Sequence, residues 1–158
     1  MGWERVALDL RGAALQALHV IQPLLQEKGQ VLEIDLPEPL PVISDPARLE
    51  HVVINLLANA HRHTPSGTRI ALSGRDTPQE ARLTVRDTGP GIPPGAHEAI
   101  FGRFYRLDPA ACGSGLGLAV ARAFVERHGG RLWAEQAPEG GAVFHVTLPP
   151  SAEAEGIT

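Results

Sequence analysis

Asp87-Thr-Gly-Pro-Gly-Ile92 and, about twenty residues later, Gly113-Ser-Gly-Leu-Gly-Leu118 are the stretches that decide the fold of this chain. The first places a carboxylate beside a glycine turn. The second places a run of glycines at the head of an apolar segment with helical spacing. A buried carboxylate can accept a hydrogen bond from the amino group of a base, and a glycine-rich helix N-terminus can hold phosphates. Together the two stretches indicate an ATP site.

Each stretch has other interpretations when it is taken alone. Asp87 can equally be a turn residue whose side chain caps the backbone. The glycine run is not a P-loop, because no Gly-Lys-Ser or Gly-Lys-Thr triplet occurs in the chain. It also differs from a dinucleotide fingerprint, which requires Gly or Ala at position 118 and a strand in place of Pro109–Cys112. The remaining interpretation of the glycine run is a flexible loop whose backbone N–H groups face an anion.

A third informative segment is the helix predicted from Pro46 to about His63. Asp45 is a suitable N-cap, and Pro46 is favoured in the first turn. Thr64-Pro-Ser-Gly67 should end the helix. One face of it is apolar and predicts the core contact: Leu49, Val52, Val53, Leu56, Leu57 and Ala60.

The opposite side of this helix carries a polar stripe at helical spacing: His51, Asn55, Asn59 and Arg62. Asn is a poor helix former, so two of them in one stripe require an explanation. An amide oxygen is a good ligand for a hard cation, and Mg²⁺ on ATP needs only one or two protein oxygens. A solvated helix face with chance Asn residues is the alternative.

The remaining pattern predicts an α/β two-layer sandwich with a mixed sheet. Leu15, Leu18, Ile21 and Leu25 predict a helix over 10–28, in which Pro23 should cause a kink or break. A further helix is predicted over about 115–127. Strands are predicted at 30–36, 68–73, 82–87, 132–135 and 142–148.

Composition limits the class of protein. The 158 residues form one domain, expected over 1–148 with a flexible tail at 149–158. No apolar run approaches the roughly 20 residues of a membrane span, and the first residues lack the order of a signal peptide. A net charge of −4 argues against nucleic acid as a partner. The single cysteine, Cys112, excludes an internal disulfide and fits a reducing compartment.

In this order, the segments resemble the ATP-binding catalytic domain of sensor histidine kinases, within the superfamily that includes gyrase-type ATPases and Hsp90. Asn55–Pro65 matches the N box of that family, Asp87–Ile92 the G1 box, Phe101–Arg106 the F box and Gly113–Leu118 the G2 box. The resemblance covers roughly residues 8–148. It implies a Bergerat-type α+β fold, with about three helices on one face of a mostly antiparallel sheet of about five strands.

The resemblance also implies a role for each position. Asn59 would bind Mg²⁺ with support from Asn55, Asp87 would accept a hydrogen bond from adenine, and Arg106 would approach the γ-phosphate. Leu116 and Leu118 would anchor the helix in the core. The full set of candidate nucleotide-binding residues is Asn55, Asn59, Arg62, His63, Asp87, Gly89, Gly91, Ile92, Arg106, Gly113, Ser114, Gly115, Leu116, Gly117 and Leu118.

Position 55 distinguishes phosphoryl transfer from hydrolysis. Hydrolysing relatives carry a Glu one helical turn before the metal-binding Asn, whereas this chain has Asn55, and an amide has no useful basicity. The sequence therefore favours transfer to a protein nucleophile. In the family this is a His on a dimeric two-helix hairpin, which the chain lacks. His97-Glu98 matches only the dipeptide and lies after the G1 box.

The expected partners are thus a dimerisation and phosphoacceptor domain of the same kinase and, indirectly, a response regulator. The isolated domain is expected to be monomeric and cytoplasmic. The sequence leaves open whether the full protein carries a membrane anchor elsewhere. Two features depart from the family: His63 replaces a common aromatic residue, and the lid at 107–112 is short and has no basic residue. An anti-sigma-factor-type serine kinase and a non-catalytic nucleotide-binding module are the alternatives.

Overall fold

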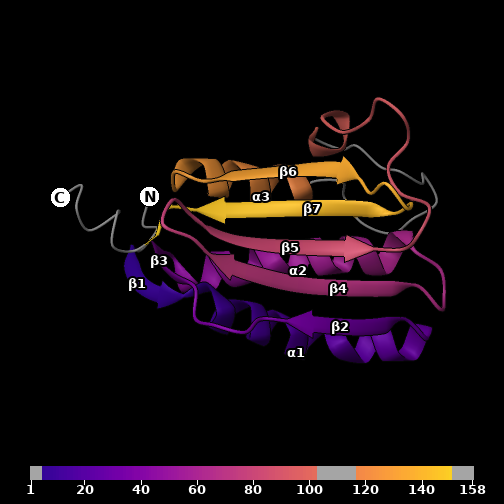
Figure 1. The fold of residues 1–158 in the computed structure, drawn as a ribbon, viewed down its shortest axis with the longest axis horizontal. Coiled ribbons are helices and arrows are strands. Elements are labelled where there is room, and N and C mark those ends of the chain that lie inside the picture. The colour runs from indigo at the N-terminus through magenta and orange to yellow at the C-terminus, as the bar shows by residue number, and fades with distance from the viewer. Residues whose placement is uncertain (1–4, 103–116, 151–158) are drawn as a thin grey trace.

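The computed structural model describes residues 5–102 and 117–150, which form two layers (Figure 1). The chain order of the elements is β1 (Val6–Asp9), α1 (Leu10–Lys28), β2 (Val31–Asp35), β3 (Pro41–Ser44), α2 (Pro46–His63), β4 (Arg69–Asp76), β5 (Ala81–Asp87), a 3-10 turn η1 (Ala99–Phe101), α3 (Gly117–Arg127), β6 (Arg131–Gln136) and β7 (Ala142–Leu148).

The main sheet has five strands in the order β2-β4-β5-β7-β6. Strand β2 runs parallel to β4, and every other pair is antiparallel, so the sheet is mixed. Helices α1, α2 and α3 all lie on one face of it, behind the strands in Figure 1. The predicted α/β sandwich of about five strands and three helices is therefore confirmed.

Strand alternation produces the core between these layers. The inward side chains of β4, β5 and β7 are apolar and buried, whereas the residues between them face the other side of the sheet. The inward set includes Ile70, Leu72, Leu83, Val85, Phe144 and Val146. One predominantly apolar face is what allows the helices to pack there.

Helix α2 follows the sequence prediction closely. The Asp45 carboxylate accepts a hydrogen bond from the Arg48 backbone N–H at 3.2 Å, as an N-cap does. The helix ends at His63, with Thr64 as its C-cap. All six residues of the predicted apolar face are buried, so the polar stripe on the other side is oriented by the core contact.

Helix α1 covers the predicted residues but has no break at Pro23. It is one uninterrupted helix through Pro23, because that proline lies on the exposed side, four residues after the exposed His19. The His19 carbonyl that loses its partner there therefore borders solvent. Leu15, one of the four residues whose spacing predicts the helix, is 40% exposed, and the buried face includes Ala14 and Ala17. The small Ala residues satisfy the same helical spacing.

Two short strands were not predicted. Strands β1 and β3 form a separate antiparallel pair in which Val6 lies opposite Ser44 and Asp9 opposite Pro41. The prolines of this region predict only an extended connection. Helix α3 is described from Gly117, and most of the predicted F box and G2 box, with the last eight residues of the expected tail, lies outside the described residues.

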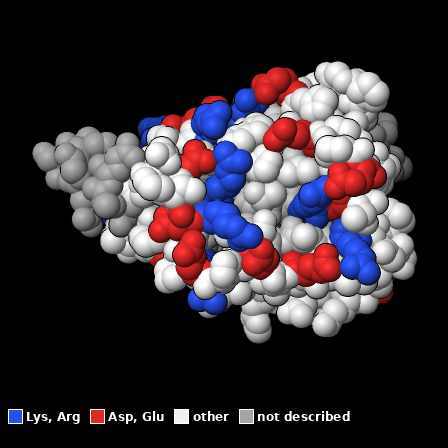
Figure 2. Space-filling model, in the orientation of Figure 1, with Lys and Arg blue, Asp and Glu red and all other residues white. Residues whose placement is uncertain are grey.

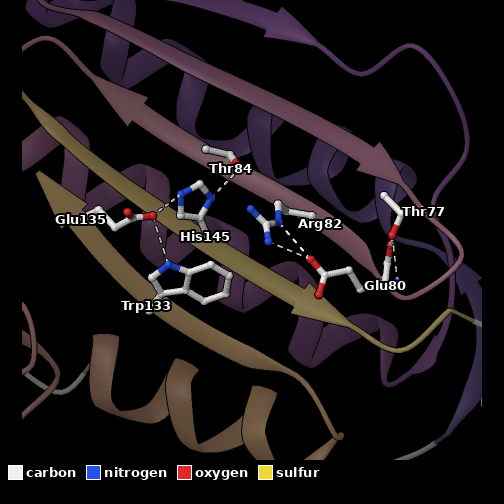
Figure 3. Close-up of polar contacts among 7 residues, drawn as sticks. All are labelled: Thr77, Glu80, Arg82, Thr84, Trp133, Glu135 and His145. Carbon is white, nitrogen blue, oxygen red and sulfur yellow. Dashed lines mark hydrogen bonds and ion pairs between the residues drawn. The ribbon is translucent and has the colours of Figure 1, made fainter. Parts of the chain in front are cut away.

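The open face of the sheet carries charges of both signs among uncharged residues, as Figure 2 shows. Between β5, β7 and β6, His145 lies between the Thr84 hydroxyl and the Glu135 carboxylate, at 3.0 and 2.9 Å (Figure 3). The Trp133 ring lies beside the His145 ring with centroids 4.9 Å apart, and its N–H donates to Glu135 at 3.2 Å. These contacts explain how a sheet face without a helical cover satisfies its polar groups.

Candidate functional site

A cleft of about 470 Å³ lies where the C-terminal end of α2 meets the turn after β5. It brings together three predicted site residues, Arg62, His63 and Gly91, from segments separated in sequence. Backbone and side chains of both segments form its wall, and Lys28 at the end of α1 adds a second cation beside Arg62. The cleft is therefore basic on the α2 side, which suits an anionic ligand. The complete lining is Lys28, Arg62, His63, Thr64, Pro65, Pro90, Gly91 and Pro93.

Asp87 ends β5 and is 6% exposed. Its Oδ1 atom accepts hydrogen bonds from the backbone N–H groups of Gly89 at 2.9 Å and Ala142 at 3.3 Å. The turn interpretation of Asp87 is thus correct for one carboxylate oxygen. The Oδ2 atom has no hydrogen-bond donor among the described residues, yet no fully buried side-chain oxygen there lacks a partner. Oδ2 consequently reaches accessible space and can accept a hydrogen bond from a ligand.

Asn59 lies in the last turns of α2 and is 7% exposed. Its amide makes no hydrogen bond with another residue in the described part of the chain, and no fully buried amide atom there is unsatisfied. The amide atoms of Asn59 must therefore touch accessible space. An otherwise buried amide with a free oxygen has the donor chemistry expected of a ligand to a hard cation.

Asn55, one turn earlier, has a different environment. Its Nδ2 atom donates to the Gly117 carbonyl at 3.3 Å, so it connects α2 to the first residue of α3. A Cβ atom at Gly117 would lie 3.5 Å from the Asn55 amide, an ordinary contact. Leu118, the next residue, packs partly buried against the core. The stripe residue Asn55 thus orients the helix that follows the predicted G2 box.

Thr64 and Gly89 press the end of α2 against the turn after β5. A Cβ atom at Gly89 would lie 2.6 Å from the Thr64 methyl carbon, so only glycine permits this approach. Thr64 is held in turn, because its hydroxyl donates to the Ala60 carbonyl at 2.7 Å and accepts from Gln30 Nε2 at 2.7 Å. The predicted N box and G1 box are therefore one packed unit.

Gln30 makes this junction rigid. Its buried amide group also donates to the carbonyl oxygens of His61 at 3.1 Å and Thr64 at 3.0 Å. Its Oε1 atom lies 2.9 Å from His61 Nδ1, which must donate because a carbonyl oxygen only accepts. Burial lowers the pKa of His61, and Lys28 and Arg62 lower it further. A neutral imidazole fits this network.

The other side of the turn is held by Gln136, at the end of β6. Its Oε1 atom accepts a hydrogen bond from the Ile92 backbone N–H at 2.8 Å. Gly91 has φ +82°, and a Cβ atom there would lie 2.4 Å from Gln136 Nε2. Ile92 itself is buried in the core. Sequence reasoning missed Gln30 and Gln136, because no local pattern marks either residue as a partner of a distant turn.

Five predicted site residues lie outside the described residues: Arg106, Gly113, Ser114, Gly115 and Leu116. Among the described residues, no group of three or more His, Cys, Asp or Glu side chains could hold a metal ion.

A larger hollow of about 510 Å³ lies on the open face of the sheet. Its floor is made of small outward side chains such as Ala71, Ser73 and Thr84, and none of the predicted site residues lines it. Volume alone would favour this hollow. The cleft at α2 is the better candidate because it is lined by the predicted site residues Arg62, His63 and Gly91 and carries two cations, although Asn59 and Asp87 are not among its lining residues.

The geometry defines a class of protein: an α/β sandwich with a basic cleft between the end of helix α2 and the glycine turn after β5. Residues 44–152 match the family model described as histidine kinase-, DNA gyrase B-, and HSP90-like ATPase. The chain therefore belongs to this family, and it is an ATP-binding catalytic domain of the histidine kinase kind. The resemblance inferred from the four sequence motifs is confirmed.

Similar proteins agree with this assignment. The adaptive-response sensory kinase SasA of Trichormus variabilis is 42% identical over 139 residues, which are 85% of this chain and 35% of that protein. The mycobacterial sensor histidine kinase MprB has a TM-score of 0.80 and 31% identity, covering 93% of this chain and 98% of that one. Histidine kinase ThkA, in its complex with the response regulator TrrA, has a TM-score of 0.82 and 27% identity, covering 96% and 43%.

The chain thus spans about a third of the length of SasA. In the part of the chain that the structure describes, no helix combines the length and apolar character required to cross a bilayer.

Proposed function

We propose that this domain binds ATP with Mg²⁺ and transfers the γ-phosphoryl group to a His on a separate dimerisation and phosphoacceptor domain of the same kinase. One observation carries the proposal. At the packed junction of α2 and the turn after β5, the otherwise buried Asp87 and Asn59 each keep polar atoms that no other described residue engages.

The two residues have complementary tasks. Asp87 Oδ2 accepts a hydrogen bond from the amino group of adenine, while Gly89 and Gly91 let Thr64 and Gln136 pack closely against the turn that carries Asp87. The Asn59 amide oxygen binds Mg²⁺, which neutralises charge on the phosphates. Arg62 contributes a positive charge at the mouth of the cleft. Arg106 and the glycines 113, 115 and 117 complete the phosphate contacts in this proposal.

Transfer is favoured over hydrolysis because the α2 stripe contains no carboxylate base. Asn55 has an amide where a base would be needed, and its Nδ2 is already engaged with the Gly117 carbonyl. Phosphoryl transfer needs little covalent chemistry from the protein, so positioning and charge neutralisation supply most of the catalysis. The attacking group then comes from the partner domain, in line with the leaving oxygen.

The similar proteins support the proposed partners. SasA and MprB are named as sensor kinases, and ThkA is seen with a response regulator. We therefore propose that a response regulator acts downstream of the phosphoacceptor domain, and that the full protein works in the cytoplasm or anchored at the inner membrane. Neither nucleic acid nor a second copy of this domain is required for the chemistry.

A transfer experiment tests the proposal. The chain is mixed with a two-helix phosphoacceptor domain from a related kinase and ATP labelled on the γ-phosphate. We expect label on the acceptor that is lost in acid and retained in base, as for phosphohistidine. Acid-stable label would favour the serine kinase alternative. Nucleotide binding without any transfer to several acceptor domains would favour the non-catalytic module.

Replacement of Asn59 tests the metal role. Asn59→Ala should weaken Mg²⁺-dependent ADP binding at least tenfold in calorimetry, because the cation loses its protein oxygen, and should leave the melting temperature nearly unchanged. His51→Ala, in the same stripe two turns earlier, is the matched control. Wild-type affinity in Asn59→Ala would contradict the assigned role.

A further inference from the structure

The turn between β6 and β7 contacts both ends of the adenine-binding segment. At one end, the Ala142 N–H donates to Asp87 Oδ1 at 3.3 Å. At the other end, Gln136 Oε1 accepts from the Ile92 N–H at 2.8 Å. Residues 136 and 142 are themselves paired across the hairpin formed by β6 and β7. The segment from Asp87 to Ile92 is thus held at its start and its end by one rigid turn.

We propose that Gln136 is a positioning residue for adenine recognition, acting through the backbone of Gly91 and Ile92. This inference rests on the proposed function, because it assumes that Asp87 reads the base. Gln136 touches no ligand in this proposal. It fixes the position of the turn relative to Asp87, so that the base can contact Asp87 Oδ2 and the backbone of the glycine turn at the same time.

The contact at Gly91 shows why the side chain matters. Gly91 adopts φ +82°, which disfavours other residues, and the Gln136 amide occupies the space where a Cβ atom would lie. The glutamine therefore packs against the turn as well as bonding to it. Gly91, where this contact is made, and the preceding Pro90 both line the candidate cleft. A shift of the turn would consequently alter the cleft wall itself.

Hydrogen bonds within the turn between β6 and β7 make it a stable support. Within it, the Ala137 N–H donates to the Gly141 carbonyl at 2.9 Å and the Gly140 N–H donates to the Ala137 carbonyl at 3.0 Å. Gln136 is an exposed strand residue apart from its amide contact, so replacing it removes little core packing. Its expected effect is therefore on ligand binding more than on folding.

The test measures ADP and GDP binding by calorimetry, with Mg²⁺, for the wild-type chain and four variants. Gln136→Met keeps the side-chain length but removes the acceptor oxygen. Gln136→Glu keeps an acceptor at the same position. Glu139→Gln lies in the same turn, breaks only the surface ion pair with Arg86, and serves as the matched control. Asp87→Asn reports on the adenine site directly.

We expect Gln136→Met to lower ADP affinity about two- to tenfold, which corresponds to one hydrogen bond, and to narrow the ADP-over-GDP preference. Gln136→Glu should have the ADP affinity and the base preference of the wild type. Glu139→Gln should change neither the ADP affinity nor the base preference. A purely structural role would lower the melting temperature while leaving base preference intact, and that result would overturn the inference.

The variants also separate the two proposals. If Asp87→Asn weakens ADP binding but Gln136→Met binds like the wild type, the positioning role is wrong and the adenine site stands. If Gln136→Met and Glu139→Gln weaken binding equally, the effect belongs to the whole turn and the specific role of Gln136 is wrong. If nucleotide binding survives both Asp87→Asn and Gln136→Met unchanged, the assigned adenine site is wrong and the inference fails with it.

Discussion

Asp87 illustrates how the backbone decides what a carboxylate can offer to a ligand. Two N–H groups, from Gly89 and Ala142, both point at Oδ1. The other oxygen is left for a donor outside the described residues. One side chain can therefore serve both interpretations that the sequence left open, since Oδ1 makes the turn cap and Oδ2 remains for the proposed recognition of a base.

This division predicts the behaviour of Asp87→Asn. The amide oxygen of Asn will take the position of Oδ1, because the two N–H groups require an acceptor, and its NH₂ group will then face the amino group of adenine. We expect ADP affinity to fall about ten- to hundredfold, as for the loss of a hydrogen bond to a charged group. Calorimetry with ADP and GDP measures it. Because the cap is retained, the melting temperature should stay within a few degrees, and an unchanged ADP-over-GDP preference would contradict the role.

At the scale of elements, the decisive contacts join segments that are distant in sequence. Gln30 bonds to Thr64 across 34 residues, and Gln136 bonds to Ile92 across 44 residues. Helix periodicity and strand alternation report only on near neighbours, so they predicted α2 and the five strands of the main sheet but not these two glutamines. The sheet order and the parallel β2–β4 pair are equally non-local.

The errors of the sequence analysis have the same physical origin. Leu15 fits the helical spacing but is exposed, and Ala14 and Ala17 lie in the buried face, so the spacing of large apolar residues predicts the helix without defining all of its buried face. The β1–β3 pair is short and contains Pro41, so its strand signal is weak until the partner is known. Motif order, by contrast, was enough to identify the family, because four ordered motifs have little chance of arising together.

The turn between β6 and β7 offers a matched pair of glycines for a test at this scale. Gly140 and Gly141 have φ +100° and +93°, so alanine is strained at both. A Cβ atom at Gly140 meets nothing within 4 Å, whereas one at Gly141 would collide with the backbone of Asp87 and Thr88. The difference between the two variants therefore isolates the approach of this turn to the backbone of Asp87 and Thr88.

We expect Gly141→Ala to be less stable than Gly140→Ala by about 1–3 kcal/mol in urea unfolding, because a backbone contact cannot be relieved by a side-chain rotation. We also expect ADP binding to weaken in Gly141→Ala alone. Equal stability of the two variants would show that the turn can move away from Asp87, and it would weaken the argument that this turn fixes the site.

At the scale of the whole molecule, three histidines in distant parts of the fold make its stability depend on pH. Burial lowers the pKa of His61, His128 and His145. For His145 the Glu135 carboxylate opposes this effect, but burial outweighs it, and Arg82 adds to the lowering. A neutral His145 fits its contacts, since Nε2–H donates to Glu135 and Nδ1 accepts from the Thr84 hydroxyl (Figure 3).

These shifts predict that the domain loses stability in mild acid. When the folded pKa of a histidine is lower than its unfolded value of about 6.5, the unfolded chain binds the proton more readily, so the free energy of unfolding falls as the pH drops below 6.5. Well above pH 7 the three groups are almost entirely neutral in both states and contribute little slope. Urea unfolding at pH 7.5, 6.5 and 5.5 measures the effect, and His145→Gln should reduce the slope by removing one of the three groups. The exposed His19→Gln variant is the control for the substitution itself, and a stability that rises on acidification would contradict the burial of these imidazoles.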